Sequence, residues 1–153
     1  MEHLPKRKAN RLPDYNYSSS GAYFITICAR EKQCIFGKGL ELLPNGRIVQ
    51  QQMEKMAHFY THVRVDKYVI MPNHVHLLLI VEVESASHIA ANHIVPQFVS
   101  TLKRFSNKLA GDHLWQRSYH DHIIRNEEDY RRICQYIDTN PVKWNEDCYF
   151  AED

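Results

Sequence analysis

The sequence predicts an α+β domain with a ferredoxin-like (split βαβ) antiparallel sheet, helices on one face and an extra C-terminal helix. The first observation is the order of the predicted elements: strand, helix, strand, strand, helix, strand, helix. The second is composition, because 153 residues with 44% hydrophobic and 24% charged side chains suit one globular domain. We therefore expect a partly basic lead over residues 1–20, a single domain over 21–145 and an acidic tail over 146–153.

The first strand and helix are predicted from the residues that follow the lead. Residues 22–29 (AYFITICA) are rich in aromatic and β-branched side chains, which favour a strand. Glycine, proline and asparagine residues between positions 37 and 46 interrupt regular structure. From 47 to about 60 apolar side chains recur at helical spacing, which indicates an amphipathic helix.

Two strand-like segments follow, KYVIM at 67–71 and HVHLLLIV at 74–81. Only Pro72 and Asn73 separate them, so we expect a tight antiparallel connection, although Pro-Asn is not a favoured hairpin turn.

A second helix is predicted to open at Pro96, since proline suits the first helical position. Its buried stripe is expected to consist of Phe98, Leu102, Phe105 and Leu109. Lys103, Arg104 and Lys108 lie off this stripe and are expected to face outward.

The last strand and helix are predicted over residues 118–140. Residues 118–125 (SYHDHIIR) are typical of a strand. Asn126 is a suitable N-cap and is followed by three acidic residues, which favour a helix start. The helix is expected to run to Asn140, where Pro141 stops it. Its buried stripe comprises Tyr130, Ile133, Cys134 and Ile137.

Composition and charge narrow the possible functions. No apolar run reaches the ~18 residues needed to cross a bilayer, and no secretory signal is visible, so we expect a cytoplasmic protein without membrane contact. The four cysteines form no CxxC pair, which favours reduced thiols over disulfides or a zinc site. A net charge of +1 means that binding to nucleic acid would depend on a local basic patch and on salt.

The segment MPNHVHLLLI places two histidines, His74 and His76, on one face of a strand. Two imidazoles that converge from one face can hold one divalent metal ion. The alternative is a pair of core histidines satisfied by hydrogen bonds, although burial of two polar rings in an apolar strand costs free energy without compensation.

The C-terminal helix places two polar residues on the flank of its buried stripe. Tyr136 lies off the centre of that stripe, and Asn140 follows four residues later on the same flank. A tyrosine in this position, taken alone, is most often a half-buried aromatic residue.

Together these motifs resemble a known family. The HVH strand, followed about sixty residues later by YRRICQYIDTNPVKW, is similar to the single-tyrosine HUH transposases, especially the REP-associated tyrosine transposases of bacteria. The resemblance extends from Tyr23 to Trp144 and includes WQRSYHDHIIRN. It implies that His74 and His76 bind Mg²⁺ or Mn²⁺, with Asn140 as the third ligand. It also implies that Tyr136 attacks single-stranded or hairpin DNA.

The residue types suit this chemistry. A phenol has an ordinary pKa near ~10 and needs activation to act as a nucleophile. A divalent ion on His74 and His76 would offset phosphate charge and stabilise the departing 3′ oxygen. Tyr136 would become joined to the 5′ phosphate, and another 3′ hydroxyl could reverse the step, so the expected reaction is strand transfer.

Further residues are candidate DNA contacts. His120 and His122 form a second HxH, but Asp121 between them fits the metal motif of the family less well. The candidate DNA contacts are Lys103, Arg104, Trp115, Arg117, His122 and Arg125.

Two other functions are compatible with the sequence. One is a domesticated protein that recognises a nucleic-acid hairpin without cutting it, and the other is a metal hydrolase that uses water and not Tyr136. The family includes dimers that combine one subunit's tyrosine with the other's histidines, and members that act as monomers, so a homodimer is possible.

Overall fold

The computed structural model describes residues 21–82 and 91–146. The predicted lead and nearly all of the predicted tail therefore lie outside the described residues. The strands are β1 (Gly21–Cys28), β2 (Gly37–Lys38), β3 (Glu41–Leu42), β4 (Val63–Met71), β5 (His74–Val81) and β6 (His120–Ile124). The helices are α1 (Pro44–Phe59), α2 (Ala91–Ala110) and α3 (Glu127–Thr139), with short 3₁₀ turns η1 (Arg30–Lys32) and η2 (Trp144–Glu146).

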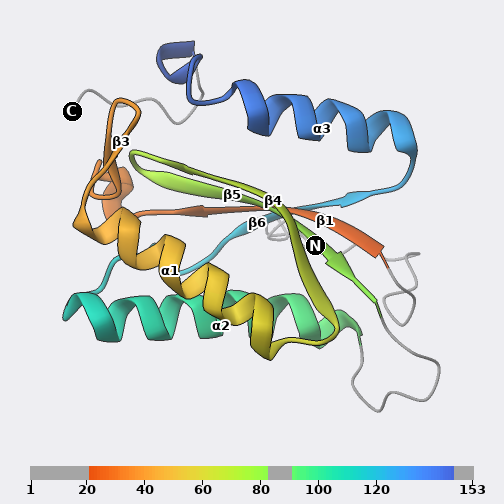
Figure 1. The fold of residues 1–153 in the computed structure, drawn as a ribbon, viewed down its shortest axis with the longest axis horizontal. Helices are drawn as coiled ribbons and strands as arrows, with labels where there is room; N and C mark the ends of the chain where they lie inside the picture. Colours follow the sequence, from red (N-terminus) through yellow and green to blue (C-terminus); the bar gives the residue numbers. More distant parts are fainter. Residues whose placement is uncertain (1–20, 83–90, 147–153) are drawn as a thin grey trace, which may run out of the picture.

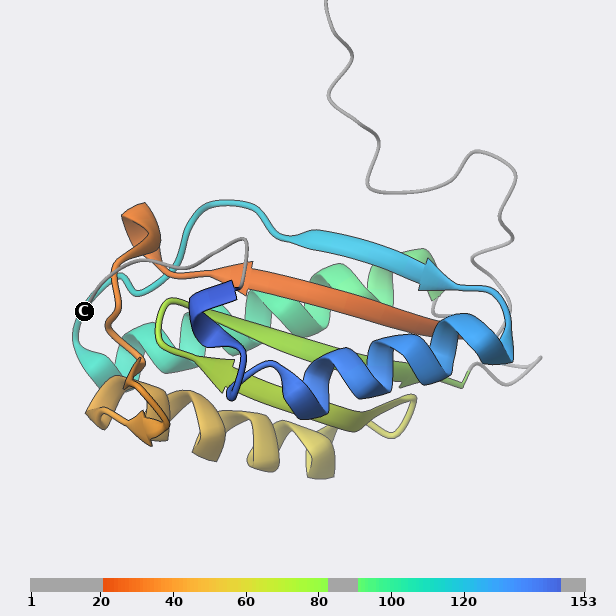
Figure 2. The ribbon, with the colours of Figure 1, turned by 90° about the horizontal axis from the view of Figure 1, so that it is seen from above.

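Four strands form an antiparallel sheet in the order β4-β5-β1-β6. This order confirms the predicted split βαβ arrangement. Helices α1 and α2 cover one face of the sheet, and α3 lies over the other (Figures 1 and 2). In the described ranges no helix is both long and apolar enough to cross a bilayer.

Strand alternation divides the apolar residues between two clusters. Val75, Leu77 and Leu79 of β5 join the main core with α1 and α2. Leu78 joins a smaller cluster under α3, with Ile133 and Ile137. Because alternate residues of a strand share a face, His74 and His76 lie on the α3 side with Leu78. The side of the sheet that carries the histidines is therefore the side that α3 covers.

The predictions for α2 were wrong in two respects. The helix begins at Ala91, so Pro96 lies inside it instead of opening it. Phe105 and Leu109 are 41% and 56% exposed, because Ser106 takes the buried position at that turn. The Ser106 hydroxyl donates to the Leu102 carbonyl and accepts from the Trp115 indole, at 2.6 and 2.8 Å. A buried hydroxyl with two partners is invisible to a pattern of apolar residues.

The other boundaries differ from the predictions by smaller amounts. Strand β4 begins at Val63, four residues before the predicted start, and has an irregular register between Val65 and Lys67. The short hairpin of β2 and β3 was not predicted, because its strands are only two residues long. The N-cap was correct, since the Asn126 side chain accepts a hydrogen bond from the Asp129 backbone N–H at 2.8 Å.

Gly46, in the first turn of α1, has no room for a side chain. A Cβ there would lie 2.1 Å from the Phe36 carbonyl oxygen, which a side chain cannot occupy. We expect Gly46→Ala to lower the free energy of unfolding by about 3 kcal/mol, measured by denaturant titration. Gly111→Ala is the control, because Gly111 has φ +67° and open space, and should cost only about 1 kcal/mol. Equal losses in the two variants would contradict the packing argument.

Candidate active site

The centre of the site is the pair of imidazoles on β5. His74 and His76 are both buried, and their Nε2 atoms are 3.0 Å apart. The opposite nitrogens have partners as well, since His74 Nδ1 lies 2.8 Å from Asn73 Oδ1 and His76 Nδ1 lies 2.8 Å from Thr26 Oγ1. Each ring is therefore held at its far nitrogen while the two near nitrogens converge.

This geometry fits a divalent cation. Two ligands at right angles around an octahedral ion, each bonded at about 2.1 Å, are about 3.0 Å apart. Hydrogen bonds to the far nitrogens of such ligands are the usual way in which proteins orient metal-binding histidines. The same contacts also satisfy the buried rings without an ion. Among the described residues no group of three or more His, Cys, Asp or Glu side chains could hold a metal ion.

Tyr136 lies beside this pair. Its ring centroid is 5.2 Å from that of His76, and the residue is 37% exposed. Phe24 stacks on His76 at 5.1 Å and meets the Tyr136 ring edge-on at 6.0 Å. The fold thus brings a partly exposed phenol next to a histidine sixty residues away in the chain.

The end of α3 supplies the other side of the site. Asn140 is the C-cap of α3 and is only 3% exposed. Trp144 of η2 lies over His74, with ring centroids 5.9 Å apart. The turn that follows α3 therefore brings Trp144 against His74, while α3 and its C-cap carry Tyr136 and Asn140.

Polar contacts with both outer strands hold α3 over the sheet. On the β4 side, Lys67 forms an ion pair with Asp138 at 2.8 Å, and this hydrogen bond raises the pKa of Lys67. On the same side the Tyr130 hydroxyl donates to Asp66, which raises the pKa of that phenol. These contacts fix the side of α3 that lies over β4.

On the β6 side, His122 contacts Asp129 of α3 at 2.7 Å. Burial raises the pKa of Asp129, but hydrogen bonds from His122 and Arg132 outweigh this and hold it below its ordinary value. The contacts with β4 and β6 therefore restrain α3 from opposite edges, and the helix is positioned across the width of the sheet.

Two of the candidate DNA contacts have structural roles instead. The Trp115 side chain is buried against Phe36, so it presents no open ring face to a base. Lys103 donates to the Gln116 and Ser118 carbonyls, and burial lowers its pKa. The linear sequence gave no sign of either role, because both depend on how the segment after α2 folds back.

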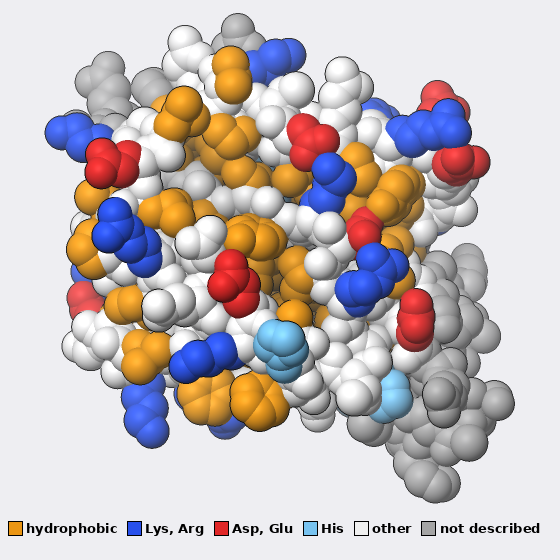
Figure 3. All heavy atoms as spheres, viewed as in Figure 1, with side chains coloured by type: hydrophobic (Ala, Val, Ile, Leu, Met, Phe, Trp, Pro, Cys, Tyr) orange, Lys and Arg blue, Asp and Glu red, His pale blue; other side chains and the backbone are white. Residues whose placement is uncertain are grey.

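The remaining candidates are exposed but do not form one group. Arg104 is on α2, on the face of the sheet opposite α3, and lies over the Phe105 ring. Arg117 precedes β6, His122 is within it and Arg125 follows it. The space-filling view, which looks at the side formed by α1 and β4, shows acidic and basic side chains interspersed among apolar ones there (Figure 3). His122 contacts α3 through Asp129.

Four residues of the site were missed by the sequence analysis: Phe24, Thr26, Asn73 and Trp144. A polar Thr26 in the otherwise apolar strand AYFITICA was a usable signal. Asn73 follows Pro72 between two strands, a position that by itself indicates only a turn. Phe24 reaches His76 across the sheet, and Trp144 reaches His74 from the turn after α3, so neither role had a local signal.

Comparisons with known proteins agree with this architecture. An uncharacterized protein of Haemophilus influenzae is 34% identical over 169 aligned positions, which cover 95% of this chain and 94% of that protein. A REP-associated tyrosine transposase of Escherichia coli K12 is 23% identical over 133 positions, covering 83% and 70%. The structure of a REP-associated tyrosine transposase bound to a REP hairpin shares the fold, with a TM-score of 0.64, 20% identity and coverage of 87% and 73%.

The family comparison covers most of the domain described above. The model for the family described as "Transposase IS200 like" matches residues 21–140, which span β1 to the C-cap of α3. The match therefore contains the histidine pair, Tyr136 and Asn140. This chain belongs to the IS200-like transposase family.

Proposed function

We propose that the protein is a metal-dependent endonuclease and strand transferase for single-stranded DNA, which forms a 5′-phosphotyrosine at Tyr136. The observation that carries this proposal is the position of the Tyr136 ring, 5.2 Å from His76, whose Nε2 converges with that of His74. A partly exposed phenol beside paired imidazoles places a nucleophile next to groups that could activate it, either directly or through a bound metal ion.

His74 and His76 would hold Mg²⁺ or Mn²⁺, with Asn140 as a third ligand. When bound, the ion would act as a Lewis acid that offsets the charge of the scissile phosphate. Asn140 suits this role because an amide oxygen is a hard ligand and because its buried side chain follows Tyr136 by one helical turn.

The reaction exchanges one phosphodiester for another. The Tyr136 oxygen attacks phosphorus and loses its proton, while the bond to the 3′ oxygen breaks and that oxygen gains a proton. The products are a 5′-phosphotyrosine and a free 3′ hydroxyl. Attack by a different 3′ hydroxyl reverses the exchange and joins two strands, because no phosphodiester has been hydrolysed.

We propose DNA hairpins as the substrate class. The supporting observations are the membership of the family and the similar fold of a protein bound to a REP hairpin. Arg117, His122 and Arg125 are exposed and lie in or beside β6. His122 of this group contacts α3 through Asp129. With a net charge of only +1, we expect binding to be weak and steeply dependent on salt.

The proposal needs no second subunit, since Tyr136 and His76 of one chain already lie together. This proximity favours attack by Tyr136 at the histidine pair of its own chain. The site would therefore be complete in a monomer, and a homodimer would not be needed to form it. A DNA substrate also implies action in the cytoplasm.

The first test is Tyr136→Phe, assayed with a labelled library of single-stranded hairpins and Mn²⁺ on a denaturing gel. We expect hairpin affinity within about 2-fold of the wild type and no covalent adduct, because phenylalanine keeps the ring and lacks the nucleophile. Tyr130→Phe is the matched control on the same helix, since the Tyr130 hydroxyl bonds to Asp66. It should retain the adduct.

The outcomes of this test separate the candidate functions. An adduct of full yield in Tyr136→Phe would exclude this tyrosine as the nucleophile. Cleavage without an adduct in either protein would favour a water-using metal hydrolase. Hairpin binding without cleavage by the wild type would favour a domesticated binding protein.

The second test removes the metal ligand or the metal. We expect His76→Ala to lose Mn²⁺ binding, measured by calorimetry, and adduct formation together, and EDTA to abolish the adduct of the wild type. His122→Ala is the control for Mn²⁺ binding, because its imidazole contacts Asp129 on α3 and not the histidine pair. Full cleavage in EDTA would contradict the metal role.

A further inference from the structure

The orientation of the Asn73 side-chain amide is fixed by its neighbours. Its Nδ2 lies 3.2 Å from the Lys32 carbonyl oxygen, and its Oδ1 lies 2.8 Å from His74 Nδ1. A carbonyl oxygen can only accept a hydrogen bond, so the amide NH₂ must face Lys32. The amide oxygen then faces His74, and since that oxygen can only accept, His74 Nδ1 must carry the proton.

This assignment determines which ring nitrogen carries the proton in both histidines. A neutral imidazole with a proton on Nδ1 has a lone pair on Nε2, so His74 Nε2 accepts. His76 Nε2, 3.0 Å away, must then donate. His76 Nδ1 is left as an acceptor and takes the proton of the Thr26 hydroxyl at 2.8 Å. The sequence of donors therefore runs from Thr26 through both histidines to Asn73 and Lys32.

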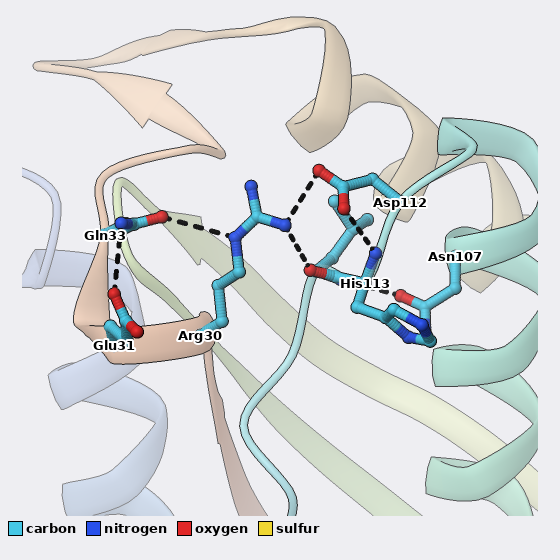
Figure 4. A network of polar contacts seen from close by, with 7 residues as sticks. Arg30, Glu31, Gln33, Asn107, Asp112 and His113 are labelled. Carbon is cyan, nitrogen blue, oxygen red and sulfur yellow. Dashed lines mark hydrogen bonds and ion pairs between the residues drawn. The ribbon is translucent and has the colours of Figure 1, made fainter.

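The carbonyl at the end of this sequence sits in an unusual backbone conformation. Glu31 and Lys32 have φ values of 51° and 54°, in the left-handed region that non-glycine residues rarely adopt. Arg30 anchors this turn, because its guanidinium contacts the His113 carbonyl and the Asp112 carboxylate, each at 2.7 Å (Figure 4).

The turn is also fixed to the chain around Asn73 itself. The Ala29 N–H donates to the Asn73 backbone carbonyl at 2.8 Å, and the Phe36 N–H donates to the Pro72 carbonyl at 2.9 Å. Asn73 is 1% exposed. The contacts of Arg30 thus hold the Lys32 carbonyl in position, and the backbone hydrogen bonds at Pro72 and Asn73 hold the Asn73 amide.

We propose that Asn73 is a positioning residue that presets His74 for cation binding, and that Thr26 is its adjustable counterpart at His76. Asn73 can only accept from His74, so the His74 Nε2 lone pair always faces His76. A cation between the rings needs both Nε2 lone pairs, so the His76 proton must pass from Nε2 to Nδ1 by exchange with solvent. The Thr26 hydroxyl then changes from donor to acceptor, and no net proton is released.

This inference rests on the proposed metal role of the histidine pair, but its first test needs neither DNA nor catalysis. Long-range ¹H–¹⁵N spectra of the full chain, labelled in histidine, report which ring nitrogen carries the proton. We expect the Nδ1–H form for His74 and the Nε2–H form for His76 without metal. Addition of diamagnetic Zn²⁺ should change the protonated nitrogen of His76 only.

Variants separate positioning from general structure. Asn73→Leu, which removes both polar atoms, should leave His74 in a mixture of tautomers and weaken Mn²⁺ binding about 10- to 100-fold. Asn73→Asp keeps the acceptor and should keep the His74 tautomer. If Asn73→Leu does not fold, Thr26→Val and Thr26→Ser test the other end: the valine variant should weaken Mn²⁺ binding similarly, and the serine variant should restore it.

Three results would overturn the proposal: a His74 proton on Nε2 in the wild type, a change of tautomer at His74 instead of His76, or wild-type tautomer and Mn²⁺ affinity in a folded Asn73→Leu. The predicted tautomers without any Mn²⁺ binding would support the orientation of His74 by Asn73 and contradict the proposed function.

Discussion

The arrangement of the site depends on the burial of β5 on both of its faces. This strand pairs with β4 on one side and with β1 on the other over its whole length. The register places His76 opposite Thr26, which its Nδ1 contacts, and keeps both histidines on the face toward α3. A slip of one residue would turn the imidazoles into the apolar core of α1 and α2. Hydrophobic packing on the far face therefore fixes the position of the polar pair.

The helix that carries Tyr136 is held differently from the other two. Helices α1 and α2 share the main core, whereas α3 rests on a smaller apolar cluster around Leu78 and Ile137 and on polar contacts at both sheet edges. Exposed ion pairs contribute little to stability because water and salt screen them. Elements of this kind are the first to open in native proteins. In the proposed reaction Tyr136 would carry a DNA strand from one partner to another, and a helix that can open locally would suit that role.

The sequence was sufficient for the sheet class and for the order of the four strands and three helices of the main domain, whereas the roles of His74, His76, Tyr136 and Asn140 stay predictions. Long apolar strands and a capped amphipathic helix have strong local patterns. Local patterns failed where a residue's environment is made by distant segments. Trp115 was predicted to contact DNA and is buried beside Ser106, and Phe105 was predicted to be buried and is exposed. Phe24 and Thr26 reach the site only because β1 pairs with β5.

The left-handed turn at Glu31 and Lys32 determines whether the site could be grafted onto another protein. Each non-glycine residue in this conformation costs about 1–2 kcal/mol, which the surrounding contacts must offset. Transfer of the MPNHVH segment to another antiparallel sheet would therefore move the two imidazoles. It would leave behind the Lys32 carbonyl, which orients the Asn73 amide. An engineer who grafts the motif needs the η1 turn and its Arg30 anchor as well, so the smallest transferable unit is a tertiary arrangement of several chain segments.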